Sequence, residues 1–199
     1  MITDFHTHTL KRNAVVNVDP VDLTDLSRPV FRPGYLYSVG IHPWNLAKVT
    51  PESLRLLRAL AASPQVVAIG ECGLDPLSPI RPHGPIGPHG PMPPISSPLT
   101  QQELLRYHIS LSESLRKPLI LHIVKRFPEI IRLKKELKPT QRWIIHGFRG
   151  KPELARELLR HGFTLSFGHR YNPASLALTP PDRLLRETDT MSIPSTPDL

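Results

Sequence analysis

The sequence predicts an α/β fold, and two observations make a (β/α)8 barrel of the TIM type the expected architecture. Short apolar runs alternate with amphipathic stretches along most of the 199 residues, which is the pattern of parallel strands joined by helices. Eight such runs are present, and near-continuous apolar runs suit strands that are buried on both faces. Eight parallel strands that each lead into a crossover close into a barrel.

The expected strands can be placed from the apolar runs alone. In chain order they are residues 2–6, 14–18, 35–41, 66–71, 119–122, 143–146, 163–167 and 184–189. Because side chains alternate between the two faces of a strand, each run also predicts which residues face the barrel interior. Cys72, next to Glu71, is expected to face outward.

Helices are expected between several of these strands. Thr100 and Glu103 have the spacing of a capping box, and a helical repeat of apolar residues and His108 follows them. Pro152 has the position of a first-turn proline, and Gly162 is placed to end the same helix. Residues 51–62 and 127–137 are further expected helices.

The predicted barrel is short. Barrels of this kind usually need about 250 residues, and residues 11–32 contain no convincing crossover helix. Only residues 190–199 follow the last expected strand. We therefore expect a single domain, residues 1–199, with some outer helices missing.

A proline-rich insertion, residues 76–98, follows the fourth expected strand. From Pro76 to Pro94 a proline occurs at every third position, which is the period of a polyproline II helix. Two interpretations remain open: a disordered loop, or a stiff arm whose apolar edge packs on the barrel or on another subunit.

Composition narrows the expected location and partners. Lys and Arg exceed Asp and Glu by 25 to 17, a formal net charge of +8, which suits either a polyanionic partner or an ordinary solvated surface. No apolar stretch approaches the roughly 20 residues that span a bilayer, and the first residues lack the pattern of a signal peptide. With one cysteine and no internal disulfide, the expected location is the cytoplasm, with no membrane partner.

Residues that can bind a metal stand at the ends of the apolar runs. His6 and His8 are one residue apart, so they project from the same side of a strand. The others are Glu71, His122, His146 and Asp189. Taken singly, each has an ordinary structural explanation, such as a core histidine or a capping aspartate. Together they lie where a parallel barrel forms its active site.

The same residues carry a resemblance to a known family. The segments that carry it are Asp4-Phe5-His6-Thr7-His8, Gly40-Ile41-His42-Pro43, Ile69-Gly70-Glu71-Cys72-Gly73-Leu74-Asp75, Leu121-His122, Ile145-His146-Gly147-Phe148-Arg149-Gly150 and Glu187-Thr188-Asp189. In this order they resemble the TatD family of metal-dependent hydrolases. The resemblance spans nearly the whole chain, and residues 70–75 are its most specific element.

The resemblance implies a two-metal site that hydrolyses phosphodiesters, often in DNA. On the family pattern, one divalent ion is held by His6, His8 and Asp189, and the other by His122 and His146. Glu71 would bridge the two ions, and Asp189 would orient the attacking water and accept its proton. Zinc, manganese or magnesium suits these ligands.

Three neighbouring side chains are candidates for substrate contact. Lys125 and Arg149 lie near strand ends and can bind a phosphate, and ordinary loop charge is the alternative. His42 either lines the pocket or has a structural role beside Pro43.

Three functions remain open on the sequence. The first is a nuclease-like hydrolase acting on DNA or a small phosphate ester. The second is a hydrolase of another small ester or amide, and the third is a catalytically degenerate barrel that serves as a binding scaffold. Thr190 and Met191 depart from the usual small residue and proline after the final aspartate, and this departure counts against the transfer of nuclease activity more than against metal binding.

Overall fold

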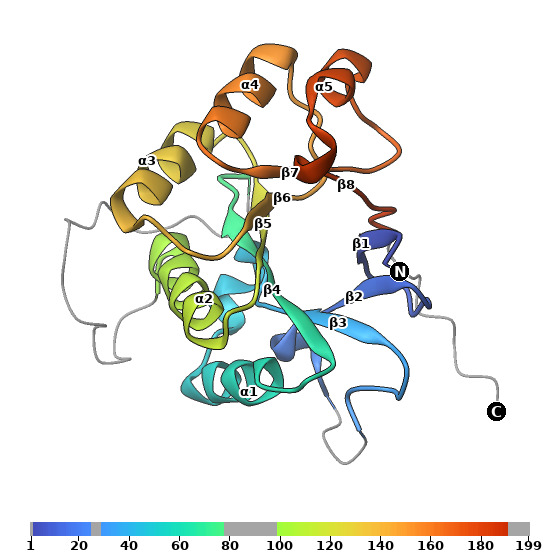
Figure 1. The fold of residues 1–199 in the computed structure, drawn as a ribbon. Helices are drawn as coiled ribbons and strands as arrows, with labels where there is room; N and C mark the ends of the chain where they lie inside the picture. The colour runs from blue at the N-terminus through green and yellow to red at the C-terminus, as the bar shows by residue number, and fades with distance from the viewer. Residues whose placement is uncertain (1, 25–28, 78–98, 191–199) are drawn as a thin grey trace.

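The computed structural model describes residues 2–24, 29–77 and 99–190, and its centre is one eight-stranded parallel sheet. The strands are β1 (Asp4–Thr7), β2 (Ala14–Val18), β3 (Leu36–Val39), β4 (Val66–Leu74), β5 (Leu119–Ile123), β6 (Trp143–Ile145), β7 (Thr164–Phe167) and β8 (Leu184–Arg186). Each pairs in parallel with the next in sequence. The sheet curls into a nearly closed barrel (Figure 1), so the predicted fold class is confirmed.

The barrel closes just beyond its last strand. The Asp189 amide donates to the His6 carbonyl at 3.0 Å, and the His8 amide donates to the Thr190 carbonyl at 3.1 Å. The sequence placed Asp189 at the end of the eighth strand, but β8 ends at Arg186. Asp189 has a φ of 47°, a left-handed conformation that a strand residue cannot adopt.

Five α-helices in the described part of the chain cover part of the barrel. They are α1 (Pro51–Ala61), α2 (Gln101–Leu115), α3 (Phe127–Leu137), α4 (Pro152–Arg160) and α5 (Pro173–Leu178), with 3-10 turns η1 (Pro20–Asp22), η2 (Pro43–Lys48) and η3 (Pro181–Arg183). The four predicted helices are present to within two residues at each end. The capping box at Thr100 forms as expected: its hydroxyl accepts from the Glu103 amide, and the Glu103 carboxylate accepts from the Thr100 amide. Helix α5, capped by Asn172, was not predicted because six residues show no clear period.

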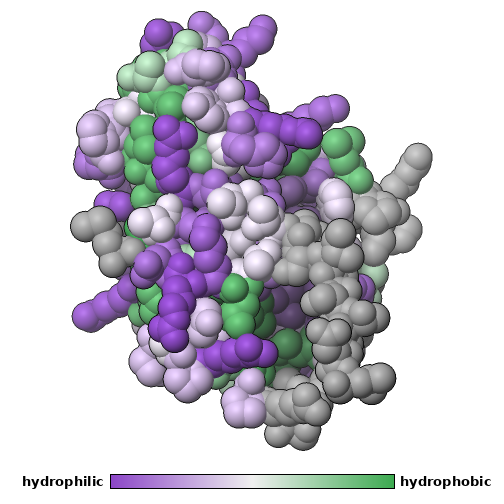
Figure 2. Space-filling model, turned by 90° about the vertical axis from the view of Figure 1, so that its right-hand side faces the viewer, coloured by the Kyte–Doolittle hydropathy of each residue, from purple (hydrophilic) through white to green (hydrophobic). Residues whose placement is uncertain are grey.

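The expected loss of outer helices falls on one side of the barrel. In Figure 1 the helices α1 to α5 follow one another around the strands, whereas β1 and β2 at the right carry none among the described residues. Residues 8–13 join β1 to β2 without a helix, and the described part of the next link holds only η1. Figure 2 faces this side, where hydrophilic residues surround smaller hydrophobic patches.

The apolar core has two layers. A small cluster comprises Val15, Ala68, Ile120 and Ile144, all from strands. A larger cluster joins the outward faces of the strands to the helices, and it includes the fully buried Cys72. The outward orientation expected for Cys72 agrees with this packing.

The close approach of β4 to β5 depends on glycine. Gly73 has a φ of 157°, and a Cβ added there would overlap the His122 carbonyl. The register also shifts between Ile69 and Cys72. These features let β4 run through Glu71 to Leu74, three residues further than the sequence predicted.

Apart from its first two residues, the proline-rich insertion lies outside the described residues. Within the described part of the chain, none of the helices combines the length and the apolar character needed to cross a bilayer.

Candidate metal centre

The six predicted ligands gather at the C-terminal end of the barrel, and Glu71 lies at their centre. This residue is in β4 and its side chain is almost fully buried. Its Oε2 atom lies 3.2 Å from Nε2 of His6 and 3.5 Å from Nε2 of His8. As the strand alternation predicts, the two histidines at the end of β1 therefore meet one oxygen of the same carboxylate.

The other oxygen of Glu71 faces a second pair of imidazoles. Its Oε1 atom lies 2.8 Å from Nδ1 of His122, in β5, and 2.8 Å from Nε2 of His146, directly after β6. Those two ring nitrogens are 3.1 Å apart. One carboxylate thus separates two pairs of nitrogen donors, one pair on each oxygen.

Asp189 adds a second carboxylate beside the first pair of histidines, His6 and His8. Its Oδ1 lies 3.7 Å from Nε2 of His6 and 3.8 Å from Nε2 of His8. The preceding residue is clamped to β1, because the buried Asp4 carboxylate accepts from both the amide and the hydroxyl of Thr188 at 3.0 and 2.7 Å. The clamp and the backbone bond to His6 fix where the Asp189 side chain begins.

The residues present fit a metal centre. Imidazoles mixed with carboxylates suit zinc, manganese and related divalent ions. His6 is completely buried, and neither ring nitrogen has a hydrogen-bond partner among the described residues, although the Glu71 carboxylate is close. A buried imidazole without such a partner is costly unless something else satisfies it. Ligand atoms close enough to share an ion occur in the groups His6–His8–Glu71, His6–His146–Asp189 and His42–Glu71–His122.

The electrostatics of the centre favour positive charge. Burial by itself would raise the pKa of Glu71, but the charge of His146 and hydrogen bonds from the surrounding imidazoles hold it well below its usual range. Burial would lower the pKa of His146, yet Glu71 and Glu187 raise it well above 6.5. The pKa of His8 is raised chiefly by its hydrogen bond to Glu71. Buried carboxylates thus draw positive charge toward the imidazoles.

Two carboxylates behind the ligands were not assigned a role from the sequence. Glu187 lies 3.4 Å from Nδ1 of His146 and accepts from the Gly147 amide at 2.6 Å. Asp75 lies 3.1 Å from Nε2 of His122. Such partners orient a metal-binding imidazole and fix its tautomer. Both residues stand in the segments that carry the family resemblance, which was the available signal.

His42 has a structural contact and also faces the site. Its Nδ1 accepts from the Trp44 amide at 3.1 Å, while its Nε2 lies 3.4 Å from Oε1 of Glu71. A neutral ring that accepts at Nδ1 carries its proton on Nε2. The geometry therefore favours His42 as a hydrogen-bond donor toward the centre over His42 as a third metal ligand on that side.

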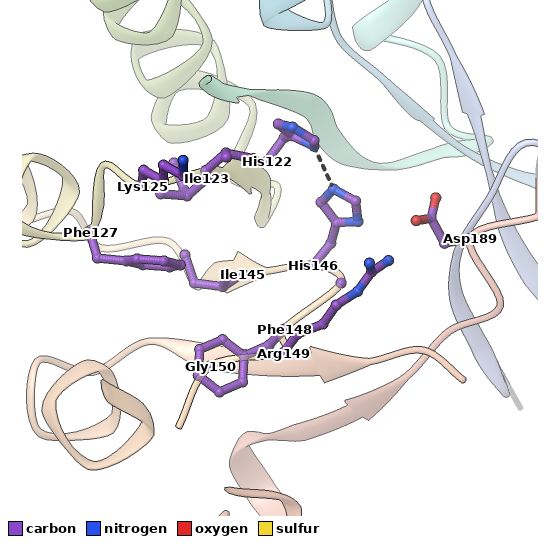
Figure 3. A pocket seen from close by; sticks show the side chains of 12 residues that line it. His122, Ile123, Lys125, Phe127, Ile145, His146, Phe148, Arg149, Gly150 and Asp189 are labelled. Atoms are coloured by element: carbon purple, nitrogen blue, oxygen red, sulfur yellow. Dashed lines mark hydrogen bonds between the residues drawn. The ribbon is translucent and has the colours of Figure 1, made fainter. Parts of the chain in front are cut away.

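A cavity of about 330 Å³ opens beside the centre. His122, His146 and Asp189 line it toward the centre, and Phe127 and Phe148 are among its apolar walls. Both predicted phosphate-binding residues, Lys125 and Arg149, also line it. In Figure 3 the Arg149 side chain extends toward His146 and Asp189. Metal ligands, cationic groups and aromatic walls therefore share one cavity.

Comparisons with known proteins agree with this arrangement. A family model described as TatD related DNase matches residues 1–197. The uncharacterized metal-dependent hydrolase YabD of Bacillus subtilis is 31% identical over 189 residues, which cover 90% of this chain and 68% of YabD. The 3'-5' ssDNA/RNA exonuclease TatD of Cronobacter turicensis is 32% identical over 162 residues, which cover 76% of this chain and 56% of that enzyme.

A solved structure shows the same fold. The TatD homologue YJJV of Escherichia coli matches with a TM-score of 0.63 and 24% identity, over 88% of this chain and 66% of that chain. The chain thus spans between about half and two thirds of the length of most relatives that it matches. Since the family model covers nearly every residue, this chain belongs to the TatD related DNase family.

Proposed function

We propose that this protein is a divalent-metal-dependent hydrolase that cleaves phosphodiester bonds in single-stranded nucleic acid. The observation that carries the proposal is the buried Glu71 carboxylate, each of whose oxygens faces its own pair of imidazole nitrogens. The chain also matches relatives named as exonucleases of single-stranded DNA and RNA. Other matched relatives, from Bacillus subtilis and Escherichia coli, are named as metal-dependent hydrolases.

Two ions, zinc, manganese or magnesium, fit the donors on the two sides of Glu71. His6, His8 and Asp189 would hold one, His122 and His146 the other, and Glu71 would contact both. When bound, such a pair supplies an activated water and neutralises charge on the attacking and leaving oxygens. Glu187 and Asp75 hold the rings of His146 and His122 in the orientation that binding needs.

Asp189 would orient the attacking water and accept its proton. Its side chain is 29% exposed, compared with 4% for Glu71, so it is the carboxylate of the centre that solvent and substrate can reach. Its left-handed backbone and its bond to His6 hold it among the residues that line the cavity. A carboxylate in that position can act as a general base.

Substrate binding would use the cavity beside the centre. Arg149 and Lys125 would contact the phosphate oxygens, and the cavity would take the end of the strand against Phe127 and Phe148. His42 would donate from Nε2 to an oxygen of the substrate. We also propose a cytoplasmic location, with which the single buried Cys72 agrees.

The test is hydrolysis of end-labelled single-stranded DNA with added manganese. Asp189→Asn should lower kcat by about 100-fold or more, while Asp182→Asn, at an exposed carboxylate on η3, should leave it unchanged. Parallel assays with amide and lactone substrates test the alternative function, which is hydrolysis of another small ester or amide. Activity confined to those substrates, or equal activity of Asp189→Asn and wild type, would refute the proposal.

A further inference from the structure

Trp44 is an exposed aromatic residue at the rim of the metal centre. It lies in η2, two residues after His42, and 48% of its surface is exposed. The other tryptophan of the chain, Trp143, is completely buried. Large aromatic side chains bury much area when they can, so a half-exposed indole beside a candidate active site needs a reason.

The indole is held in one orientation. Its Nε1 donates to Oδ2 of Asp75 at 2.7 Å. Its ring meets the His42 ring edge to face, with centroids 5.3 Å apart at 87°. A side chain fixed in this way has already lost its rotational freedom, so the binding of a ligand to it costs less conformational entropy.

The fixed indole lies next to one of the candidate metal ligands. Asp75, its hydrogen-bond partner, also bonds the ring of His122, and the Trp44 and His122 centroids are 6.4 Å apart. Trp44 does not line the cavity that holds Arg149. A phosphate at the centre would therefore place the bases on its two sides near two different parts of the protein.

We propose that the exposed face of Trp44 stacks on a nucleobase of single-stranded nucleic acid whose phosphate occupies the centre. This inference rests on the proposed function and adds the contact that positions the strand. Stacking on an aromatic plate tolerates every base, because each base has a π-face. Trp44 would thus hold the strand without selecting its sequence.

Fluorescence tests the contact without relying on turnover. Trp143→Phe leaves Trp44 as the only tryptophan. A phosphorothioate tetranucleotide of DNA should quench its emission, and the same strand with abasic sugars should not. Fluorescence anisotropy of a dye-labelled strand reports binding separately. Binding of both strands without a difference in quenching would overturn the inference, as would no binding of either strand.

Steady-state kinetics distinguish base stacking by Trp44 from a role in which Trp44 only orients Asp75. Trp44→Phe keeps an aromatic face but loses the N–H donor, whereas Trp44→Leu loses both. If Trp44 stacks on a base, Trp44→Leu should raise KM for single-stranded DNA by about 10-fold, which corresponds to the loss of one base–aromatic contact. Trp44→Phe should have a KM close to that of wild type. If Phe and Leu instead lower kcat equally at unchanged KM, Trp44 only orients Asp75 and the inference fails.

The matched control is Tyr171→Leu, which removes another exposed aromatic residue far along the chain and should leave KM unchanged. The outcomes also separate this inference from the proposed function. Base-dependent quenching without hydrolysis would sink the nuclease proposal alone. Hydrolysis without base-dependent quenching would sink the stacking proposal alone.

Discussion

His108 is a buried histidine that should limit the stability of the fold in mild acid. It lies in α2 with no exposed surface. Its Nδ1 donates to the Leu104 carbonyl at 2.7 Å, and its Nε2 accepts from the Ile41 amide at 2.9 Å. The neutral ring satisfies both partners, whereas a second proton would point at the Ile41 N–H. Burial lowers the pKa of His108 to about 4, from 6.5.

The sign and size of the effect follow from that shift. Between about pH 6.5 and about pH 4 the unfolded chain binds a proton at His108 that the folded chain does not, so stability falls as the pH falls. The loss is about 1.4 kcal/mol per pH unit within this window. Between about pH 7 and about pH 4.5 the contribution of His108 therefore falls by about 2 kcal/mol.

Urea unfolding of wild type and His108→Leu at these two pH values isolates the residue, because the other titrating groups cancel in the difference. At neutral pH the variant should be less stable by about 1–3 kcal/mol, since the buried Ile41 N–H loses its acceptor. At about pH 4.5 this gap should shrink by about 2 kcal/mol. His169→Leu, at an exposed position, is the control. A gap that stays the same at both pH values would show that His108 does not lower the stability of the folded protein in acid.

Three further substitutions test other parts of the structure. Arg149→Ala should raise KM for single-stranded DNA without changing the metal content measured by elemental analysis; a lost metal would contradict its assignment to substrate. Gly73→Ala should unfold the protein at a much lower temperature, because the added Cβ would overlap the His122 carbonyl; an unchanged Tm by circular dichroism would contradict this. Thr100→Ala should cost about 1 kcal/mol in urea unfolding through the lost cap of α2, and an unchanged free energy of unfolding would contradict this.

The barrel could be predicted because several of its strands contain consecutive buried apolar residues. The runs at β2 and β5 needed no tertiary information, since Ala14–Val16 and Leu119–Leu121 are three consecutive buried apolar residues in each strand. β4 was predicted three residues too short, because Gly73 resembles a strand breaker when it is read alone. Gly70 lies within the predicted strand. In the structure both glycines allow β4 to approach β5 closely, which a one-dimensional pattern does not show.

The candidate site was predictable only in part. The positions of His6, His122 and His146 follow from strand ends, and in a parallel barrel these ends meet. The supporting roles of Asp75 and Glu187 were not predictable from spacing, because their partners lie 47 and 41 residues away in the chain. Asp189 was placed in a strand, whereas its function in the proposed centre depends on a left-handed turn beyond it.

We propose that two divalent metal ions bind at the Glu71 carboxylate, one on the side of each oxygen. Anomalous diffraction from crystals grown with manganese tests it most directly. Two peaks are expected, one beside Oε2 near His6 and His8 and one beside Oε1 near His122 and His146. No peak at Glu71 under manganese-replete conditions, or a single peak bound only by other residues, would contradict it.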